Sequence, residues 1–510
     1  MRLMPSFLLV ATTVAGFVPG QLPANDSNSV QLIRGPYVQQ GSATNIIVRW
    51  RTDLPAASVV RYGPESNQLT LSTAKDVLET EHVLRLPNLT PDTRYFYSIE
   101  TGDSNLARGE SYFFWTAPLR SKPTRIWVLG DSGTRTPDQI AVRDSYYRFT
   151  GDRHTDLWLM LGDNAYSQGL DFVYQAAVFN VYPEMLRKSV LWPAIGNHEI
   201  VSSDPQGIDF PFLHIFSLPT AGEAGGAPSS TGRYYSYDYG NIHLICLDSE
   251  TSNRTPGSPM LQWLETDLRQ NTNLWCIAYW HSPPYSRGTH SSDLNLEQIQ
   301  MRQYVVPILE NHGADLVLCG HSHCYERSFL LNGHYGTSDT IRPAMLLNRG
   351  DGRSDGNGPY FKPNLPLKGT VYIVAGCSGQ IDGSGTLDHQ AMFNSQSALG
   401  SVVLDIDRNT LNARFLRSDG SIGDYFTIVK GDSPDNFIVR SAQVRDGIGT
   451  VTWSSLPGHY YGVEFTPDIA SPAWIEIAEP SPATSTIGLW SGPIPGAPSK
   501  GFFRVSLQVE

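Results

Sequence analysis

The chain has 510 residues, of which 40% are hydrophobic and 17% are charged, a balance typical of globular domains that excludes general disorder. At roughly 100–200 residues per domain, this length predicts three or four domains. With 37 Lys and Arg against 49 Asp and Glu, the formal net charge is −12, which argues against a general binder of the nucleic-acid backbone. A small anionic substrate would need a local source of positive charge.

The first 20 residues have the pattern of a secretory signal peptide. A single Arg precedes an apolar run from Phe7 to Val18, and the small residues at Val18-Pro19-Gly20 offer a cleavage site. The alternative, an N-terminal membrane anchor, is disfavoured because the run is shorter than the roughly 20 residues that span a bilayer. The sequence therefore predicts a secreted or periplasmic protein with no membrane span after removal of the signal.

The rest of the chain divides into three predicted domains. Residues 30–118 contain short strand-like runs separated by turn residues, which indicates a small β-sandwich, and segment 89–95 resembles the tyrosine corner of fibronectin type III domains. In residues 122–430, apolar runs of strand length alternate with helix-like stretches such as 172–188. This alternation predicts an α/β domain in which helices flank buried β-sheet. Residues 435–510 return to short strand signals and predict a second small β-sandwich, an accessory domain.

Five strand-like runs of the α/β region end in a polar or ionisable motif. The motifs are Gly130-Asp131-Ser132-Gly133, Gly162-Asp163-Asn164-Ala165-Tyr166, Gly196-Asn197-His198-Glu199, Trp280-His281-Ser282-Pro283 and Gly320-His321-Ser322-His323. Each motif alone is a weak signal, because Gly-Asp is a common turn and a single His is common in protein cores. Ligands of α/β sheets bind beyond the carboxyl ends of the strands, so the motifs are expected to converge in space.

The donor set of these motifs fits two cations. Three His, two Asp, one Asn and one Tyr exceed the four ligands that a single zinc ion takes. A shared carboxylate can bridge two ions about 3.5–4 Å apart, as in two-metal hydrolytic sites. Nitrogen and carboxylate donors favour iron, zinc or manganese over magnesium or calcium. Such a centre would supply the local positive charge that the chain as a whole lacks.

The ordered set GDSG, GDNAY, GNHE, YWHSPPY and GHSHCYERS resembles the purple acid phosphatases of the calcineurin-like metallophosphoesterase superfamily. The resemblance covers about residues 122–430, and a fibronectin-like domain is the usual N-terminal companion in that family. The wider superfamily has Asp-x-His in the first motif, whereas Gly133 stands here at the His position and Tyr166 follows Asp163 by three residues. This exchange is typical of purple acid phosphatases, in which a phenolate binds ferric iron.

Carried over residue by residue, the resemblance implies a centre of two metal ions, Fe(III) together with Fe(II), Zn or Mn. The implied ligands are Asp131, Tyr166 and His323 for the ferric ion, Asn197, His281 and His321 for the divalent ion, and Asp163 as the bridge between them.

Two further histidines are predicted to take part in catalysis. His198 follows the implied ligand Asn197, and His290 lies nine residues after His281, where the family has a substrate-facing histidine. Together with Asn197, both imidazoles would bind phosphate oxygens, and either one could protonate the leaving alkoxide. For His290, a solvated loop histidine is the competing interpretation.

Several conspicuous residues are expected to be structural. Five cysteines are too few for a disulfide framework, and their odd number leaves at least one free. Cys324 is expected to pack as a small hydrophobic residue, and Tyr325-Glu326-Arg327 to contain a buried ion pair that stabilises the loop. The histidines outside the motifs are expected to be solvated or packed; they include His154, His214, His243 and His312.

The predicted function is that of an acid phosphatase, which hydrolyses phosphate monoesters by direct attack of a metal-bound hydroxide on phosphorus. A phosphodiesterase or nucleotide pyrophosphatase with the same dimetal centre is an open alternative, because loops such as 201–232 and 333–366 set the substrate and carry no readable signal. A surface-binding protein with a vestigial centre is less favoured, since the ligand set is complete. The expected partner is a small phosphorylated substrate, and the oligomeric state stays open.

Overall fold

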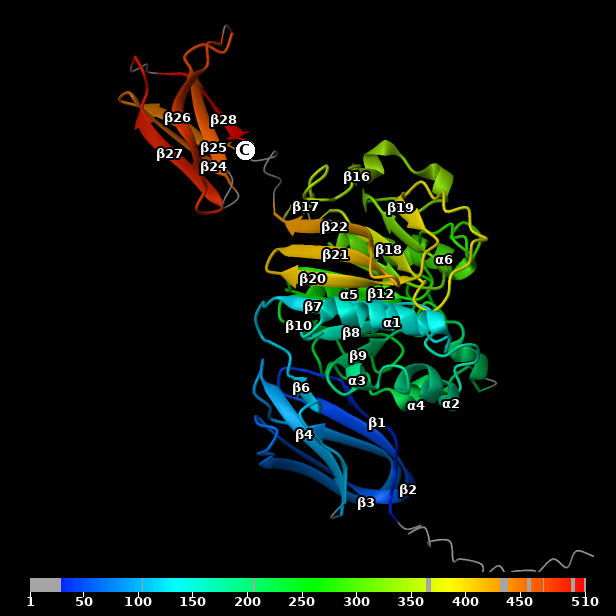
Figure 1. Cartoon of the computed structure of the whole chain (residues 1–510). Coiled ribbons are helices and arrows are strands. Elements are labelled where there is room, and N and C mark those ends of the chain that lie inside the picture. The colour runs from blue at the N-terminus through cyan, green and yellow to red at the C-terminus, as the bar shows by residue number, and fades with distance from the viewer. Residues whose placement is uncertain are drawn as a thin grey trace, which may run out of the picture.

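A computed structural model of the chain describes residues 29–102, 104–204, 207–363, 368–431, 439–455, 460–470, 472–496 and 500–508. The predicted signal peptide lies outside the described residues. Figure 1 shows, in chain order, a β domain, a larger part with both sheets and helices, and a second group of strands. In the described stretches, no helix is both long enough and apolar enough to span a membrane.

The N-terminal part is an antiparallel β domain of six strands. Its strands are β1 (Leu32–Gln39), β2 (Ile46–Gly63), β3 (Leu71–Leu86), β4 (Arg94–Thr101), β5 (Ser104–Ala107) and β6 (Phe113–Trp115). β2 is the central strand, since it pairs with β1, β3 and β4. The hydroxyl of Tyr95 accepts the N–H of Thr90 at 3.1 Å, which is the contact expected of the predicted tyrosine corner.

This β domain is packed directly on the central part. Buried side chains from both belong to one continuous hydrophobic core. At the boundary, the buried guanidinium of Arg34 pairs with Asp171 at 2.9 Å and donates to Gln175 at 2.7 Å. The hydroxyl of Tyr37 donates to the carbonyl of Ile215 at 2.8 Å. The first domain is therefore fixed to helical segments of the central part.

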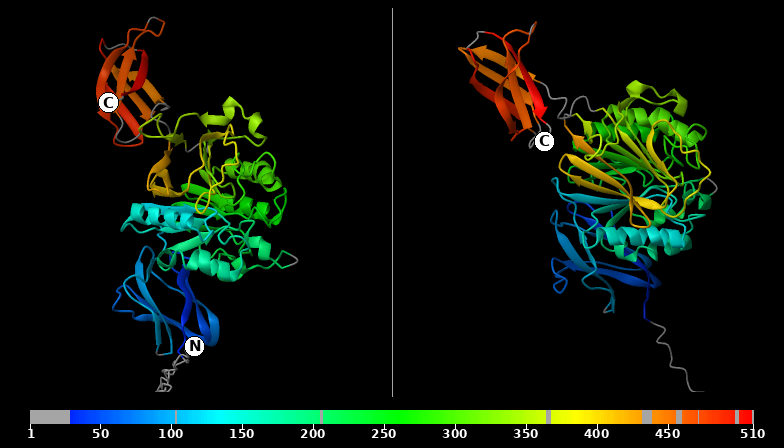
Figure 2. Two further views of the ribbon diagram at one scale, coloured as in Figure 1. Left: turned by 45° about the vertical axis from the view of Figure 1, so that its right-hand side comes forward. Right: turned by 45° about the horizontal axis from the view of Figure 1, so that its top comes forward.

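The central part contains two seven-stranded sheets stacked on each other, with helices on the outside (Figure 2). The first sheet has the order β17 (Tyr360–Lys362), β22 (Ile422–Lys430), β21 (Thr410–Arg417), β20 (Gly400–Asp407), β7 (Thr124–Leu129), β8 (Leu157–Met160) and β9 (Val190–Pro193). The second has the order β10 (Tyr235–Tyr239), β11 (Ile242–Cys246), β12 (Trp275–Trp280), β13 (Leu316–Cys319), β18 (Val371–Ala375), β14 (Tyr325–Ser328) and β19 (Met392–Gln396). A small hairpin pairs β15 (Leu330–Leu331) with β16 (Leu346–Asn348).

The strands that lead into the five motifs are entirely buried. Every residue of β7, β8, β9, β12 and β13 is buried, as expected for parallel strands covered on both faces. β7, β8 and β9 run parallel in the first sheet, and β12 and β13 run parallel in the second. Their carboxyl ends therefore bring the motifs of each sheet to one edge.

The helices cover the outer faces, and α1 packs on β20 and β21 (Figure 1). They are α1 (Pro137–Thr150), α2 (Asp171–Tyr174), α3 (Pro183–Leu186), α4 (Pro211–Ile215), α5 (Pro259–Gln270), α6 (Leu296–Gln300) and α7 (Val306–Asn311). Short π-helical and 3-10 turns are η1 (Gln175–Phe179), η2 (Glu199–Ser202), η3 (Met301–Val305), η4 (Ser338–Thr340) and η5 (Pro343–Met345). The helix-like stretch predicted over 172–188 is helical in three pieces, α2, η1 and α3. Pro183, which has no N–H to continue the preceding helix, begins the last of them.

The C-terminal strands form two antiparallel sheets of three strands each. One contains β23 (Val439–Arg445), β24 (Ile448–Ser454) and β27 (Ile487–Pro493), and the other β26 (Ile475–Pro482), β25 (Tyr460–Thr466) and β28 (Phe502–Gln508). They share a small core of Val451, Trp453, Tyr461, Val463 and Val505. This is the additional β structure that the sequence predicts for the C-terminal region.

Candidate metal centre

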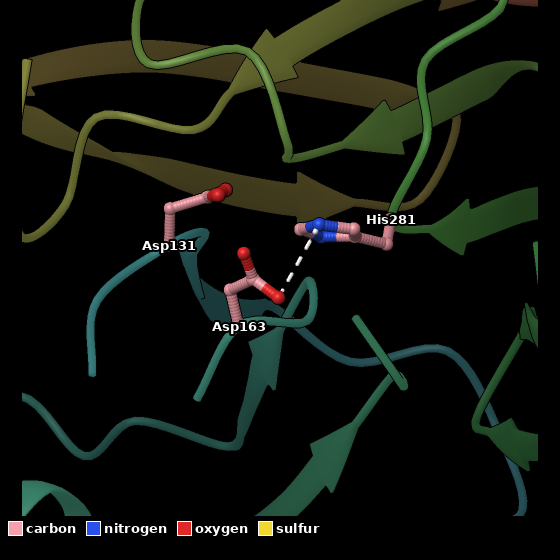
Figure 3. A group of neighbouring side chains, drawn as sticks. All are labelled: Asp131, Asp163 and His281. Atoms are coloured by element: carbon pink, nitrogen blue, oxygen red, sulfur yellow. Dashed lines mark ion pairs between the residues drawn. The ribbon is translucent and has the colours of Figure 1, made fainter. Parts of the chain in front are cut away.

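The ends of the buried strands bring acidic and histidine side chains into contact. Asp131 follows β7, Asp163 follows β8, and His281 follows β12 of the other sheet. Figure 3 shows these three side chains pointing toward one another. All three are buried, and each offers one ligand atom within 4.8 Å of the others. The two sheets thus contribute jointly to one candidate metal site.

Glycines before the site residues allow this close approach. A Cβ at Gly162 would lie 2.6 Å from Nδ1 of His281, and a Cβ at Gly320 would lie 2.5 Å from a carboxylate oxygen of Asp131. Both distances are far below ordinary van der Waals contact, so no other residue fits there without movement of its neighbours. The glycines of the sequence motifs are therefore explained by packing around the site.

Three of the predicted ligands have a left-handed backbone conformation. The φ angles are +55° for Asp131, +53° for Asp163 and +68° for His321. This region costs an L-residue about 1–2 kcal/mol, and such residues cluster at functional sites. These three side chains therefore reach the site at the cost of local backbone strain.

The first predicted triad is assembled around the Tyr166 hydroxyl. This hydroxyl donates to Oδ1 of Asp131 at 2.8 Å and lies 3.3 Å from Nε2 of His323. The same Nε2 is 3.5 Å from Oδ1 of Asp131. Three elements thus bring a phenol, a carboxylate and an imidazole together, as the sequence predicts for the ferric side.

The second predicted triad is equally close. Oδ1 of Asn197 lies 3.0 Å from Nε2 of His281 and 3.0 Å from Nδ1 of His321. The two imidazole nitrogens are 3.2 Å apart. Nδ1–H of His281 donates to the carbonyl of Leu161 at 2.8 Å, so that its Nε2 faces the site.

Asp163 adjoins both triads. Its Oδ1 lies 3.5 Å from Nε2 of His281 and accepts the backbone N–H of His198 at 2.9 Å. Burial alone would raise the pKa of Asp163, yet His281 and His198 hold that pKa well below its ordinary value. Burial and the carboxylates of Asp131 and Asp163 raise the pKa of the Tyr166 phenol well above its ordinary value. The ionised carboxylate of Asp163 thus lies between the two triads, as a bridging ligand would.

The residues present fit a pair of cations. Asp131 is 0% exposed and Asp163 is 2% exposed. Among the described residues, their ion-pair partners are histidines, with no Lys or Arg. Two buried carboxylates without a permanent cation are costly, and bound metal ions would compensate their charge.

The two predicted catalytic histidines border this cluster. His198 donates from Nδ1 to the carbonyl of Ser167 at 2.7 Å, and its Nε2 lies 3.9 Å from Oδ2 of Asp163. The ring of His290 is stacked on that of His321, with the centroids 3.9 Å apart. Burial, followed by the nearby His323, lowers the pKa of His290. The structure therefore brings all nine residues singled out in the sequence to one place.

Gly133 explains the absence of a histidine in the first motif. A Cβ at this position would lie 2.1 Å from the carbonyl carbon of Asn164, so no side chain fits. The carbonyl of Gly133 accepts the N–H of Tyr166 at 3.0 Å, and its own N–H donates to the carbonyl of Asp163 at 3.2 Å. The glycine thus holds the turn that presents Tyr166.

Sequence reasoning missed the role of Glu199. This residue is 0% exposed, and its carboxylate accepts the backbone N–H groups of Asp163, Asn164 and Gly196 at 2.7–2.8 Å. Burial, followed by the charge of Asp163, raises the pKa of Glu199 to about 7. Glu199 therefore links the turns after β8 and β9. Its place beside Asn197 in the third motif was the available signal.

Gln380, from the loop after β18, was also missed. Its Nε2 lies 3.2 Å from Nε2 of His323. No motif in the sequence marks this residue, because it reaches the site only through the pairing of β18 with β13 and β14 in the second sheet.

Two segments of the chain match known families. Residues 124–325 match the calcineurin-like phosphoesterase family, and residues 35–116 match the purple acid phosphatase N-terminal domain. The chain therefore has a calcineurin-like phosphoesterase domain together with a purple acid phosphatase N-terminal domain, and purple acid phosphatases are among its relatives. The matched phosphoesterase family implies a dimetal centre of the kind that the candidate site can form.

Individual relatives are distant. An uncharacterised protein of Mycobacterium tuberculosis is 29% identical over 323 residues, 58% of this chain and 57% of the relative. Purple acid phosphatase 23 of Arabidopsis thaliana is 32% identical over 304 residues, 53% of this chain and 62% of the relative. The chain thus spans little more than half of the mycobacterial relative.

The fold is similar to that of a solved plant structure. The purple acid phosphatase PPD1 from yellow lupin seeds superposes with a TM-score of 0.63 at 18% identity, covering 78% of this chain and 75% of that chain. This likeness extends beyond the part of the chain matched by the family models and supports the fold of the central domain.

Proposed function

We propose that this protein is an exported acid phosphatase that hydrolyses phosphate monoesters at a centre of two metal ions. The observation that carries the proposal is the convergence of two donor triads on either side of the Asp163 carboxylate. The expected substrates are small phosphorylated molecules, because a chain of net charge −12 has no general attraction for the nucleic-acid backbone.

The two triads differ in chemistry, which supports two different ions. Asp131, Tyr166 and His323 offer a phenol and a carboxylate and would hold Fe(III). Asn197, His281 and His321 offer one amide oxygen and two imidazoles and would hold Fe(II), Zn or Mn. When bound, the ions would supply positive charge for phosphate oxygens and acidify bound water.

The chain's own residues would orient the ester and move the proton. Asn197, His198 and His290 border the same space and would contact phosphate oxygens. His198, whose Nδ1–H is fixed on the Ser167 carbonyl, has Nε2 free to hold a proton and pass it to the departing alkoxide. Water would attack phosphorus in line as the ester P–O bond breaks, without a phosphorylated side chain.

The proposal is tested with the chain lacking residues 1–20, loaded with iron and zinc. Values of kcat/KM for an aryl monoester and for the matching diester are measured at acidic pH. We expect the monoester to be the better substrate. A preference for the diester would contradict the proposal and indicate a phosphodiesterase. A metal-loaded protein that is inactive on both substrates would favour a vestigial centre.

A further inference from the structure

The loop that carries His290 is held against the residues after β13 by a chain of hydroxyl groups. The backbone N–H of Gly288 donates to Oγ of Ser286 at 3.0 Å. Oγ of Ser286 lies 2.9 Å from Oγ of Ser322, which accepts the N–H of His290 at 3.3 Å. The N–H of His323 donates to Oγ1 of Thr289 at 2.9 Å. The loop and the last site motif are thus tied together at several points.

Glu326, in β14, lies beneath this loop. Its side chain is 0% exposed, and its carboxylate accepts the hydroxyl of Ser286 and the N–H of Arg287, the latter at 3.3 Å. The thiol of Cys324 lies 3.6 Å from the same carboxylate. All these neighbours donate hydrogen bonds, so the site is suited to a carboxylate rather than to an amide.

The expected buried ion pair does form, but Glu326 has no part in it. Arg327 pairs with Asp424 of β22 at 2.6 Å. Among the described residues, no Lys or Arg pairs with Glu326. A buried carboxylate compensated only by neutral donors is costly, which points to a role beyond packing.

The loop also has little room to take another path. A Cβ at Gly288 would lie 2.4 Å from Sγ of Cys324 and 2.4 Å from Oγ of Ser322. The ring of His290, two residues later, stacks on that of His321. The position of the His290 imidazole is therefore set by how tightly the loop is held against segment 322–326.

We infer that Glu326 is a positioning residue that fixes the loop 286–290 and thereby places His290 for the substrate. The inference rests on the proposed function, because it assumes that His290 contacts the phosphate ester. Glu326 acts by orienting the hydroxyl of Ser286 and by accepting the Arg287 N–H, so its effect on hydrolysis passes through His290.

The test is a double-mutant cycle in the full-length protein loaded with metals. We expect Glu326→Gln to lower kcat/KM for an aryl phosphate roughly 10–100-fold, with both metals retained. In a His290→Ala background, the same change should cost no more than about threefold, because the residue through which it acts is gone. If the fold losses of Glu326→Gln and His290→Ala instead multiply in the double variant, the inference is overturned.

The matched control is Glu310→Gln. Glu310 is also buried, at 5% exposed, and accepts hydrogen bonds from Gly333, Tyr335 and Tyr372 away from the loop. It should lose stability without a comparable loss of kcat/KM. Equal kinetic losses in the two Gln variants would show a merely structural role for Glu326 and overturn the inference.

One substitute variant and two further measurements complete the test. Should Glu326→Gln not fold, Ser286→Ala removes the same link and takes its place in the cycle. Should the wild-type protein hydrolyse no monoester, the proposed function fails, and the dissociation constant of inorganic phosphate replaces kcat/KM in the cycle. Amide hydrogen exchange should accelerate at residues 287–290 in Glu326→Gln and not in Glu310→Gln; unchanged exchange there would contradict the anchoring role.

Discussion

His198 is the better placed of the two imidazoles for proton transfer. Its Nδ1–H is fixed on a backbone carbonyl, and its Nε2 faces Asp163 at 3.9 Å, on the side where the two triads meet. His290, by contrast, depends on its loop for its position. We therefore expect the leaving-group proton to come from His198 rather than from His290.

Replacement of His198 by Ala should lower kcat roughly 10²–10⁴-fold while both metals are retained. The loss should be smaller for an aryl phosphate, whose leaving group needs little protonation, than for an alkyl phosphate. Steady-state kinetics on both substrates measure this difference. His214→Ala is the control, because that side chain is 70% exposed and, among the described residues, forms an ion pair with Asp209 alone. Equal losses on both substrates would argue against proton donation by His198.

For individual residues, the sequence predicts the candidate metal ligands well, but it predicts poorly the residues that hold those ligands in position. Asp131, Asp163 and the histidines stand at the ends of recognisable strands, so their convergence follows from sheet geometry. Glu199 and Glu326 act instead by accepting hydrogen bonds from distant backbone and hydroxyl groups. Such partners become visible only when the strands and loops are placed in space.

Among the elements, the turn after β7 is the tightest part of the site. Gly133→Ala would place a Cβ 2.1 Å from the carbonyl carbon of Asn164. We expect it to lower the free energy of unfolding by roughly 1–3 kcal/mol and to reduce the metal content, because the turn that presents Tyr166 must shift. Urea unfolding and metal analysis measure both effects.

Gly383→Ala is the matched control for this turn, since a Cβ there meets nothing within 4 Å. It should change neither stability nor metal content. If Gly133→Ala behaves in the same way, the assignment of Gly133 as the residue that holds the turn is wrong.

The turns after β8 and β9 are coupled through Glu199. Glu199→Gln replaces one acceptor oxygen by an NH₂ group that faces backbone donors, so the two turns should separate. We expect metal affinity to fall roughly 10–100-fold, measured by competition with a chelator. Glu310→Gln should leave the affinity unchanged. Equal affinities of Glu199→Gln and the wild type would contradict this role.

Element types were predictable where the pattern is strong, and boundaries were not. The largely apolar runs became buried parallel strands, as in β7 and β12. The division into two stacked sheets follows from contacts between strands far apart in the chain, such as β20 with β7. No local pattern carries that information, which is why the sequence predicts the class of fold more readily than the pairing of its strands.

For the whole molecule, stability should depend on pH through His243. This imidazole lies between Asp238 and Asp267, at 2.7 and 2.8 Å, and joins β10, β11 and α5. Burial opposes its protonation, but the two carboxylates raise the pKa of His243 to about 9. The folded-state pKa is therefore above the ordinary 6.5, so its contribution is fully present below pH 6.5 and disappears as the pH rises through about 9.

The contribution should be about 3 kcal/mol at its maximum, because the pKa of His243 rises from 6.5 to about 9 on folding. Unfolding free energies of the wild type and of His243→Gln, measured from acidic to alkaline pH, should differ most below pH 6.5 and converge above about pH 9. A difference that does not change with pH would contradict the charged state of His243.

We propose that two metal ions bind at the convergence of the strand ends, one of them Fe(III) held by Tyr166. The most direct test is a visible spectrum with metal analysis of the chain lacking residues 1–20, for the wild type and for Tyr166→Phe. We expect about two metals per chain in both, and a broad tyrosinate-to-iron band that only the wild type shows. A colourless wild-type protein with two zinc or manganese ions would contradict the ferric assignment, and a folded protein that binds no metal would contradict the dimetal centre itself.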